Sequence, residues 1–230
     1  MPEELLNACI HRFGYKFLQI YGTTETSAIT CLTLEDHKTP SLFASAGRPL
    51  FGNEVKVVDE QGRETLPGEM GEVIVRGDSV MPGYWNSPEE TESVIKNGWF
   101  HTGDVGLSDE QGYIFLKDRK KDMIVTGGEN VYPVEVENVL LQDPGLLEAA
   151  VIGVPDKKWG EQVLAIVSLR PGQKRTAEEI ISFCRERLAG YKCPKAIEFA
   201  TDPLPRTPSG KIKKNILSQP FWKGFDRKIH

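Results

Sequence analysis

The segment PRTPSGKIKK, from Pro205 to Lys214, places a serine, a glycine and Lys211 in a row near the end of the chain. Such a stretch could bind phosphate, but a Walker-type loop needs a Ser or Thr directly after its lysine, and here Ile212 follows. No hydroxyl is therefore in place to bind Mg²⁺. The alternative for Lys211 is an ordinary solvated lysine, because lysines are mostly exposed.

A second candidate is the segment YGTTET, Tyr21 to Thr26. It joins an aromatic ring, the flexible Gly22, threonine hydroxyls and the carboxylate of Glu25 on one loop after a strand-like run. Hydroxyls can donate to phosphate oxygens and a carboxylate suits Mg²⁺, so this loop could hold a metal–nucleotide. A threonine-rich turn also has purely structural explanations.

Two further segments carry polar or glycine-rich patterns. WFHTGD ends in Asp104, whose carboxylate could accept from two neighbouring hydroxyls, as in a ribose diol. DRKKDMIVTGGEN combines Arg119 with the pair Gly127 and Gly128, which permits close approach of a slender ligand. An aspartate in a turn and a glycine pair in a hairpin are the structural alternatives.

The elements that must position these residues differ along the chain. From Ala46 to Lys117, β-like runs such as EVKVVD, GEVIVRG and YIFLK alternate with turn signals, which predicts a compact, mainly antiparallel β-unit. The charged run from Lys117 to Asp122 then indicates a domain boundary. Before Ala46, FLQIYGTTETSAIT looks like a buried strand that runs into a polar loop with no evident sheet partner.

Two helices are predicted in the second half. In YPVEVENVLLQ, Pro133 suits a first helical position, although Val134 and Val136 also fit a strand. Thr176 and Glu179 form a capping-box pattern ahead of an apolar stripe. The stripe consists of Ala177, Ile180, Ile181, Cys184 and Leu188. With the strand-like runs EAAVIGV, QVLAIVSL and AIEFA, this half reads as a small α+β domain.

Composition limits the possible functions. The 230 residues are 39% hydrophobic with a formal net charge of -5, which fits a globular protein and gives no overall case for nucleic acid. Only Arg206 to Lys228 is locally basic, with seven basic residues and the acid Asp226. The four cysteines form no C-x-x-C pair, and neither a signal peptide nor an apolar run of about 18 residues is visible. We therefore expect a soluble, cytoplasmic protein without stable membrane insertion.

The order of these motifs is more specific than any one of them. The series YGTTE, HTGD, DRKKDMIVTGGENVYPVEVE, WGE and PRTPSGKIKK resembles the adenylate-forming (AMP-binding) enzymes, from about Gln19 to Leu217. Within them, GGENVYPVEVE and WGE look most like fatty-acyl-CoA and aryl-CoA synthetases. The resemblance implies an α+β chain of several subdomains: the end of a large α/β domain (1–45), a distorted antiparallel β-barrel subdomain (46–118) and a small C-terminal lid domain (119–230).

The same resemblance implies roles at the nucleotide. Such enzymes activate a carboxylic acid with ATP and Mg²⁺ to an acyl-adenylate, then transfer the acyl group to coenzyme A. Lys211 matches the catalytic lysine of the adenylation step, and Glu25 the Mg²⁺ ligand. Tyr21 would lie against the adenine, while Thr23 and Thr24 would contact phosphate, with Gly22 among them.

Further roles follow for the ribose, the hinge and coenzyme A. Asp104 would hold the ribose hydroxyls with help from Arg119, and His101 stands where the family often has Arg or Lys. Similar enzymes rotate the lid about a residue that matches Lys121. The residues expected to line the coenzyme A tunnel are Gly127, Gly128, Glu129 and Trp159.

The sequence also departs from the family. It lacks the upstream Ser/Thr/Gly-rich phosphate loop and the large region that holds the acid, so we expect a fragment of a carboxylate–CoA ligase with little turnover by itself. The alternative is a non-catalytic truncated or interaction fragment that self-associates through its exposed N-terminal segment. A nucleic-acid binder has only the basic tail in its favour, without interleaved aromatic residues.

Overall fold

The computed structural model describes residues 3–208 and 210–225. Ser209 of the PRTPSGKIKK segment and the end of the basic tail, Asp226 to Lys228, lie outside the described residues. Among the helices of the described residues, none is long and apolar enough to cross a membrane.

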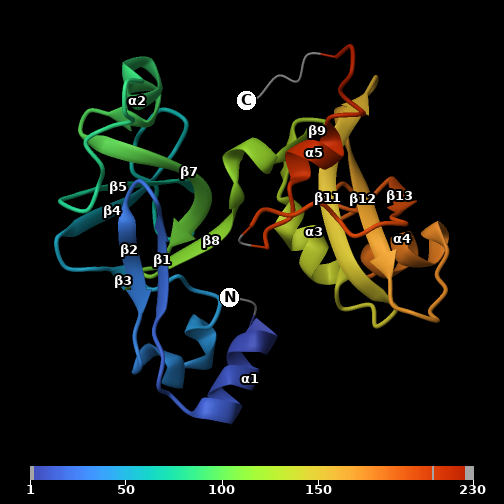
Figure 1. The fold of residues 1–230 in the computed structure, drawn as a ribbon, viewed down its shortest axis with the longest axis horizontal. Coiled ribbons are helices and arrows are strands. Elements are labelled where there is room, and N and C mark those ends of the chain that lie inside the picture. Colours follow the sequence, from blue (N-terminus) through green and yellow to red (C-terminus); the bar gives the residue numbers. More distant parts are fainter. Residues whose placement is uncertain (1–2, 209, 226–230) are drawn as a thin grey trace. The chain divides into compact units, whose positions relative to one another are not determined.

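The chain divides into two compact units, Met1–Lys120 and Lys121–His230 (Figure 1). The first unit is built from antiparallel strands with two short helices. Its helices and strands are α1 (Glu3–Phe13), β1 (Gln19–Thr23), β2 (Ser27–Leu32), β3 (Arg48–Pro49), β4 (Asn53–Val58), β5 (Gly71–Gly77), α2 (Pro88–Val94), β6 (Ile95–Lys96), β7 (Trp99–Ser108) and β8 (Ile114–Arg119).

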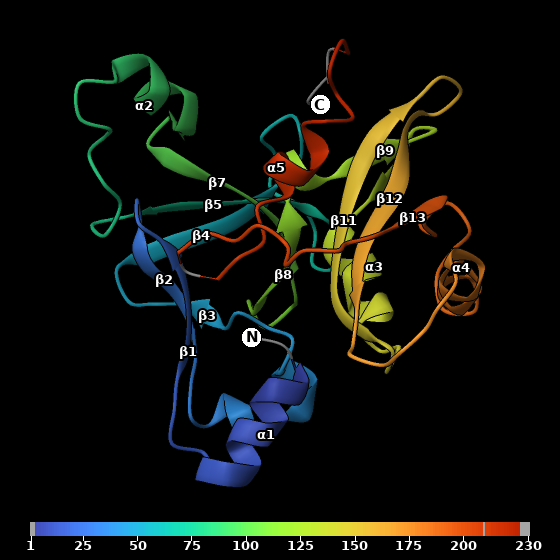
Figure 2. The same ribbon diagram turned by 45° about the vertical axis from the view of Figure 1, so that its right-hand side comes forward.

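Two sheets make up this first unit. One has the order β1-β2-β3, and the other has the order β4-β5-β7-β6, with β8 added to β7. The long strand β7 pairs with β5, β6 and β8 and curls along its length, as Figures 1 and 2 show. Because β7 carries the predicted ribose ligand Asp104, its pairing fixes where that carboxylate lies.

The expectation of a buried first strand without a sheet partner is wrong. β1 pairs with β2 in an antiparallel hairpin, with Gln19 opposite Leu32 and Tyr21 opposite Thr30. The reason is a tight turn after β1, in which Ser27 adopts a positive φ of 53° and the chain folds straight back. β1 is the edge strand of its sheet, and Ile20 is 58% exposed.

The second unit is a five-stranded sheet with helices. Its helices and strands are β9 (Ile124–Thr126), β10 (Glu129–Val131), α3 (Pro133–Leu140), β11 (Leu146–Asp156), β12 (Gly160–Leu169), α4 (Ala177–Arg185), β13 (Ala196–Phe199) and α5 (Lys214–Ser218). The sheet order is β10-β9-β12-β11, and β13 adds to β12 in parallel. β12 lies at its centre, paired with β9, β11 and β13, and its longest pairing is the antiparallel one with β11.

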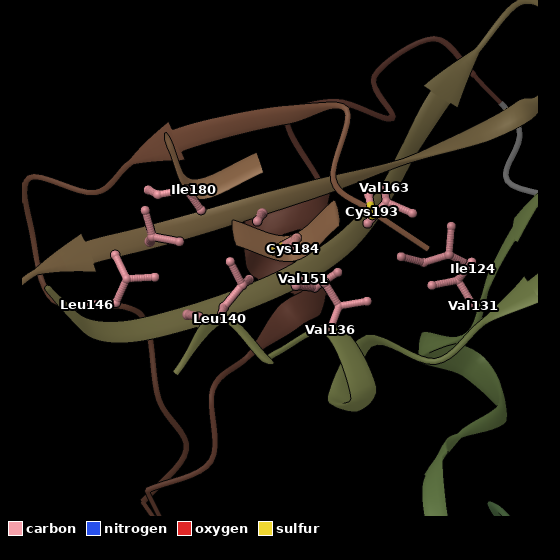
Figure 3. Packing of buried hydrophobic residues seen from close by; sticks show 13 residues of the cluster. Ile124, Val131, Val136, Leu140, Leu146, Val151, Val163, Ile180, Cys184 and Cys193 are labelled. Carbon is pink, nitrogen blue, oxygen red and sulfur yellow. The ribbon is translucent and has the colours of Figure 1, made fainter. Parts of the chain in front are cut away.

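Alternate residues of β11 serve two different cores, as the two-residue period of a strand requires. Val151 belongs to a cluster with Leu140 of α3 and Ile180 of α4 (Figure 3). Ile152, the next residue along the strand, belongs to a cluster with Leu204 instead. Helices α3 and α4 therefore cover one face of the sheet, and the C-terminal segment with α5 packs on the other.

Both predicted helices form, and the capping box is confirmed. The hydroxyl of Thr176 accepts from the Glu179 amide at 3.2 Å, and the Glu179 carboxylate accepts from the Thr176 amide at 2.8 Å. Pro133 is the first residue of α3, so VEVENVL is helical there rather than a strand. α4 ends at Arg185, before Leu188 of the predicted stripe.

The mixture of helices and largely antiparallel sheets confirms the predicted α+β class. The chain separates into two units at Lys120. The predicted division into three parts, with boundaries at residues 45 and 118, stays a prediction.

Candidate active-site residues

Three predicted nucleotide-binding residues meet in the first unit. The Tyr21 hydroxyl donates to Asp104 Oδ2 at 2.7 Å, and Arg119 Nε lies 3.2 Å from Asp104 Oδ1. Strand pairing places Asp104 opposite Arg119, and Tyr21 packs against the two apolar clusters of the unit. Burial, followed by the Asp104 charge and hydrogen bond, raises the pKa of Tyr21 well above its usual 10. Tyr21 is therefore a neutral donor that helps orient the Asp104 carboxylate.

The backbone before Asp104 is fixed by its neighbours. Thr102 Oγ1 donates to the carbonyl oxygen of Val73 at 2.7 Å and accepts from the Asp104 amide at 3.0 Å. Gly103 has a φ of +69°, a conformation that favours glycine. The residues T-G-D thus form a bend in β7 that presents a largely buried carboxylate with a defined orientation.

Glu72 of β5 was not predicted, yet it joins several groups near this bend. Its Oε1 accepts from the Gly103 amide at 3.2 Å, and its Oε2 lies 3.2 Å from His101 Nδ1 and 3.3 Å from Lys120 Nζ. Burial alone would raise the pKa of Glu72, but the His101 hydrogen bond and the Lys120 charge outweigh it and hold the pKa below its usual value. His101, the variant position of the motif, therefore pairs with this carboxylate.

Glu25, the predicted Mg²⁺ ligand, is oriented by a residue far away in sequence. Tyr84 donates its hydroxyl to Glu25 Oε1 at 3.0 Å, and the Met81 amide donates to the Glu25 carbonyl oxygen at 2.7 Å. Burial would raise the pKa of Glu25, but hydrogen bonds from its backbone, Thr23 and Tyr84 outweigh it and lower the pKa. The carboxylate is therefore held ionised, as a metal ligand must be.

The residues present fit a magnesium ion that is carried mainly by a nucleotide. No group of three or more His, Cys, Asp or Glu side chains that could hold a metal occurs in the described part of the chain. Mg²⁺ is commonly bound through one or two carboxylates together with substrate phosphates and water. A single carboxylate such as Glu25 suits that mode.

The turn of the β1–β2 hairpin requires glycine at position 22 and gives Thr24 and Thr26 different surroundings. A Cβ atom on Gly22 would lie 1.7 Å from the Ser27 carbonyl oxygen, so only glycine fits there. Thr26, which is buried, accepts from the Thr23 amide at 3.1 Å and closes the turn. Thr24 is exposed at the tip and available to a ligand.

In the second unit, two parts of the predicted coenzyme A set lie together. The Gly127 amide donates to the Trp159 carbonyl oxygen at 2.9 Å, and a Cβ on Gly127 would lie 2.8 Å from the Trp159 ring. Gly127 and Gly128 both have positive φ, and Gly128 and Glu129 are exposed. The indole of Trp159, from the connection between β11 and β12, therefore lies directly against Gly127 of the β9–β10 turn.

Two further predicted residues, Lys121 and Lys211, belong to the second unit. Lys121, the predicted hinge, is exposed, and the division between the units falls directly before it. Lys211 is exposed on a turn closed by Thr207, whose amide donates to the Lys211 carbonyl oxygen at 2.8 Å. Its ammonium group thus extends from a short hairpin of the second unit.

Two family models match the chain, that of the AMP-binding enzymes over residues 1–85 and that of the AMP-binding enzyme C-terminal domain over residues 135–211. The chain belongs to the AMP-binding, or adenylate-forming, enzymes. This membership confirms the resemblance seen in the order of its motifs.

Curated AMP-binding enzymes match almost the whole chain. A feruloyl-CoA synthase from Amycolatopsis sp is 46% identical over 221 residues, which cover 96% of this chain and 44% of that protein. The fatty acid–[acyl-carrier-protein] ligase ScoC of Streptomyces coeruleorubidus is 44% identical over 100% of this chain and 44% of its own length. The chain thus spans less than half the length of these relatives.

Solved structures of AMP-binding enzymes share the fold. ATP-bound MatB from Rhodopseudomonas palustris superposes with a TM-score of 0.88 at 35% identity, covering 97% of this chain and 44% of that one. The o-succinylbenzoate CoA synthetase of Bacillus subtilis, in complex with its acyl-adenylate intermediate, gives 0.85 at 41% identity, covering 94% and 43%.

Proposed function

We propose that this chain supplies part of the nucleotide site and the lid of an ATP-dependent carboxylate–CoA ligase. The reaction converts an acid, ATP and coenzyme A into an acyl-CoA, AMP and pyrophosphate through an acyl-adenylate. The observation that carries the proposal is the Asp104 carboxylate, held between Tyr21 and Arg119 where two vicinal hydroxyls could bind it. A fatty or other hydrophobic acid is the proposed substrate class, supported by the names of the feruloyl and fatty-acid relatives.

The chemistry explains why an exposed lysine would be needed. Adenylation brings two anions together, the acid carboxylate and the α-phosphate, and a positioned cation stabilises the charge that develops there. Lys211 offers a compact ammonium group with three donors on a side chain that solvent can reach. Glu25 would bind the Mg²⁺ that accompanies the nucleotide, and Thr24 would contact its phosphates.

Coenzyme A would act in the second half-reaction. The turn that bears Gly127 and Gly128 has no side chains at its tip, so a slender pantetheine arm could pass close to the backbone. Rotation about Lys121 would exchange Lys211 for this turn at the reaction centre. One domain would then serve two steps in succession.

We expect these 230 residues by themselves to bind nucleotide and to turn over little or no acid. The test is calorimetric titration of the chain with AMP, with Asp104→Ala as the control. Heat of binding that disappears in Asp104→Ala supports the proposed ribose contact, whereas equal binding by both proteins contradicts it. Robust pyrophosphate release from ATP and a hydrophobic acid would contradict the expected lack of turnover.

A second candidate function is self-association through β1. This strand is an edge of its sheet, and both Ile20 within it and Leu18 just before it are more than half exposed. Unpaired edge strands with apolar side chains pair readily with other chains. Size-exclusion chromatography with light scattering decides the matter, since a monomer at high concentration argues against it.

A further inference from the structure

The hairpin that carries Lys211 is small, so its position depends on what holds its two sides. An isolated bridge pairs Arg206 with Ile212, the Lys211 amide donates to Thr207 Oγ1 at 3.1 Å, and the Lys213 amide donates to the Pro205 carbonyl oxygen at 2.7 Å. A two-stranded hairpin of this kind is marginally stable in water by itself. Contacts outside the hairpin must therefore fix the lysine.

Arg206 supplies the first such contact, on the side that enters the hairpin. Its guanidinium donates through Nη1 to the Gly210 carbonyl oxygen at 2.5 Å and through Nη2 to Glu148 Oε1. Glu148 lies on β11, which pairs along its length with β12 of the sheet, and the Arg206 hydrogen bond lowers the pKa of Glu148 below the usual range. One planar fork thus ties the residue next to Lys211 to the sheet.

Lys214 supplies the second contact, on the side that leaves the hairpin. Its Nζ lies 2.9 Å from Glu137 Oε1 of α3, and the two side chains are only 15% and 14% exposed. The same Glu137 oxygen accepts from the Val151 amide of β11 at 2.8 Å. Between the two contacts, Ile212 packs on the apolar cluster that contains Leu204.

We propose that the pairs Arg206–Glu148 and Lys214–Glu137 form a two-point clamp that positions Lys211 for acyl-adenylate formation. The clamp consists of positioning residues, because the lysine rather than any of these four side chains touches the reacting groups. It rests on the proposed function of Lys211. Displacement of a catalytic group by about 1 Å can lower a rate on the order of 100-fold, so the reaction requires such a device.

The first test measures hydrogen exchange on the 230-residue chain. Arg206→Met keeps the aliphatic length and removes the fork, and we expect the amides of Lys211 and Lys213 to exchange about tenfold faster, as local opening becomes easier. Lys192→Met is the matched control, because Lys192 also joins a loop to α3, through Glu135 at 2.7 Å, but lies between α4 and β13 and not in the hairpin. Equal exchange of these amides in both variants would overturn the clamp.

The choice of Arg206 as the deciding position follows from burial. Lys214→Met leaves the largely buried Glu137 without its cation and is expected to lower the stability of the whole unit. Arg206 is 43% exposed, so its replacement disturbs the fold less. Thermal melting of Arg206→Met and Lys192→Met, expected to agree within a few degrees, separates a local effect from a global one.

The second test separates the two half-reactions, in the form of the protein in which acid-dependent ATP–pyrophosphate exchange is measurable. Arg206→Met should lower kcat of adenylation by about 10- to 100-fold and leave thioester formation from a supplied acyl-adenylate unchanged. In the Lys211→Ala background, Arg206→Met should cause no further loss, since it acts through the lysine. Additive losses, or equal losses in both half-reactions, would show a merely structural role.

The two proposals fail in different ways. The proposed function is contradicted if ATP–pyrophosphate exchange is unaffected by Lys211→Ala, or is absent from every form of the protein. Hydrogen exchange still decides, in either case, whether the hairpin is clamped. Strong loss in Lys211→Ala with full activity in Arg206→Met contradicts the clamp alone.

Discussion

The Asp104 cluster and the Lys211 hairpin hold their proposed functional groups in opposite ways. Asp104 is only 8% exposed and is contacted directly by Tyr21 and Arg119, so its carboxylate is fixed by its own hydrogen bonds. Lys211 has an exposed side chain, and the contacts that hold it are made by the backbone and by neighbouring residues. The first arrangement suits a group that binds, and the second suits a group that is presented and withdrawn.

This contrast extends to the supporting structure. The Asp104 cluster is assembled from β1, β7 and β8, which belong to two different sheets of the first unit. The Lys211 hairpin rests on one face of one sheet, through Leu204 and Ile212. We therefore expect packing changes to affect the hairpin more strongly than they affect the cluster.

The largest expected effect is on packing beneath the hairpin. Leu204→Ala removes a side chain that is 4% exposed and should lower the free energy of unfolding of the second unit by about 2–5 kcal/mol. It should also speed exchange of the Lys211 amide. Urea denaturation measures the first quantity, and Leu147→Ala, an exposed leucine of the same unit, is the control. A loss equal to that of the control would show that the hairpin does not depend on this core.

The next effect concerns the charge at position 104. Charged hydrogen bonds contribute about 1.5–3 kcal/mol each, so Asp104→Asn should weaken AMP binding by roughly 10- to 150-fold. Asp109→Asn is the control in the turn that follows β7, where the aspartate accepts from the Gln111 amide. Titration calorimetry should find AMP affinity unchanged in the control. Similar AMP affinities for the two variants would show that the Asp104 carboxylate does not bind the nucleotide.

A smaller effect is expected at Tyr21. Tyr21→Phe removes the hydroxyl that donates to Asp104 Oδ2 and keeps the ring, so AMP binding should weaken by about 0.5–1.5 kcal/mol. If the ring itself contacts the adenine, Tyr21→Leu should cost measurably more than Tyr21→Phe. Equal affinity in all three proteins would mean that Asp104 does not need this donor.

The smallest effect is a dependence of the hairpin on pH. The Arg206 hydrogen bond lowers the pKa of Glu148 in the folded chain. The stabilisation that this ion pair gives is therefore present above the pKa of Glu148 in the unfolded chain, about 4.3, and is lost as the pH falls through the lower pKa of the folded chain. Below about pH 4, exchange at Lys211 should therefore rise beyond its intrinsic pH dependence. Glu148→Gln should remove this step, and a step that persists in the variant would assign it to another group.

Local patterns in the sequence predicted local structure well. Thr176 and Glu179 lie three residues apart, and their reciprocal capping bonds form as expected because the partners are one helical turn from each other. Helix α2 was missed although Ser87, Pro88 and the acids that follow are typical of a helix start. Its short length and polar surface leave little apolar periodicity to detect.

Contacts between residues far apart in the chain could not be predicted from the sequence. The motifs singled out Asp104 and Glu25, but not Glu72 and Tyr84, which hydrogen-bond near them or to them. Glu72 lies 31 residues from Gly103 and Tyr84 lies 59 residues from Glu25, so no local pattern in the sequence links them. The expectation that β1 has no partner failed for a local reason, because the tight turn that ends at Ser27 folds the next segment back as β2.

The two-sided burial of β11 restricts how the chain can evolve. Its residues serve alternate cores, and Glu148 shares its side of the strand with Ile152, the side on which Arg206 and Leu204 lie. Inserting one residue into the strand would exchange the two faces, placing apolar side chains wrongly and turning the carboxylate towards the helices. Tolerated changes in length should therefore fall at exposed connections such as the turn at Gly172, and not within β11.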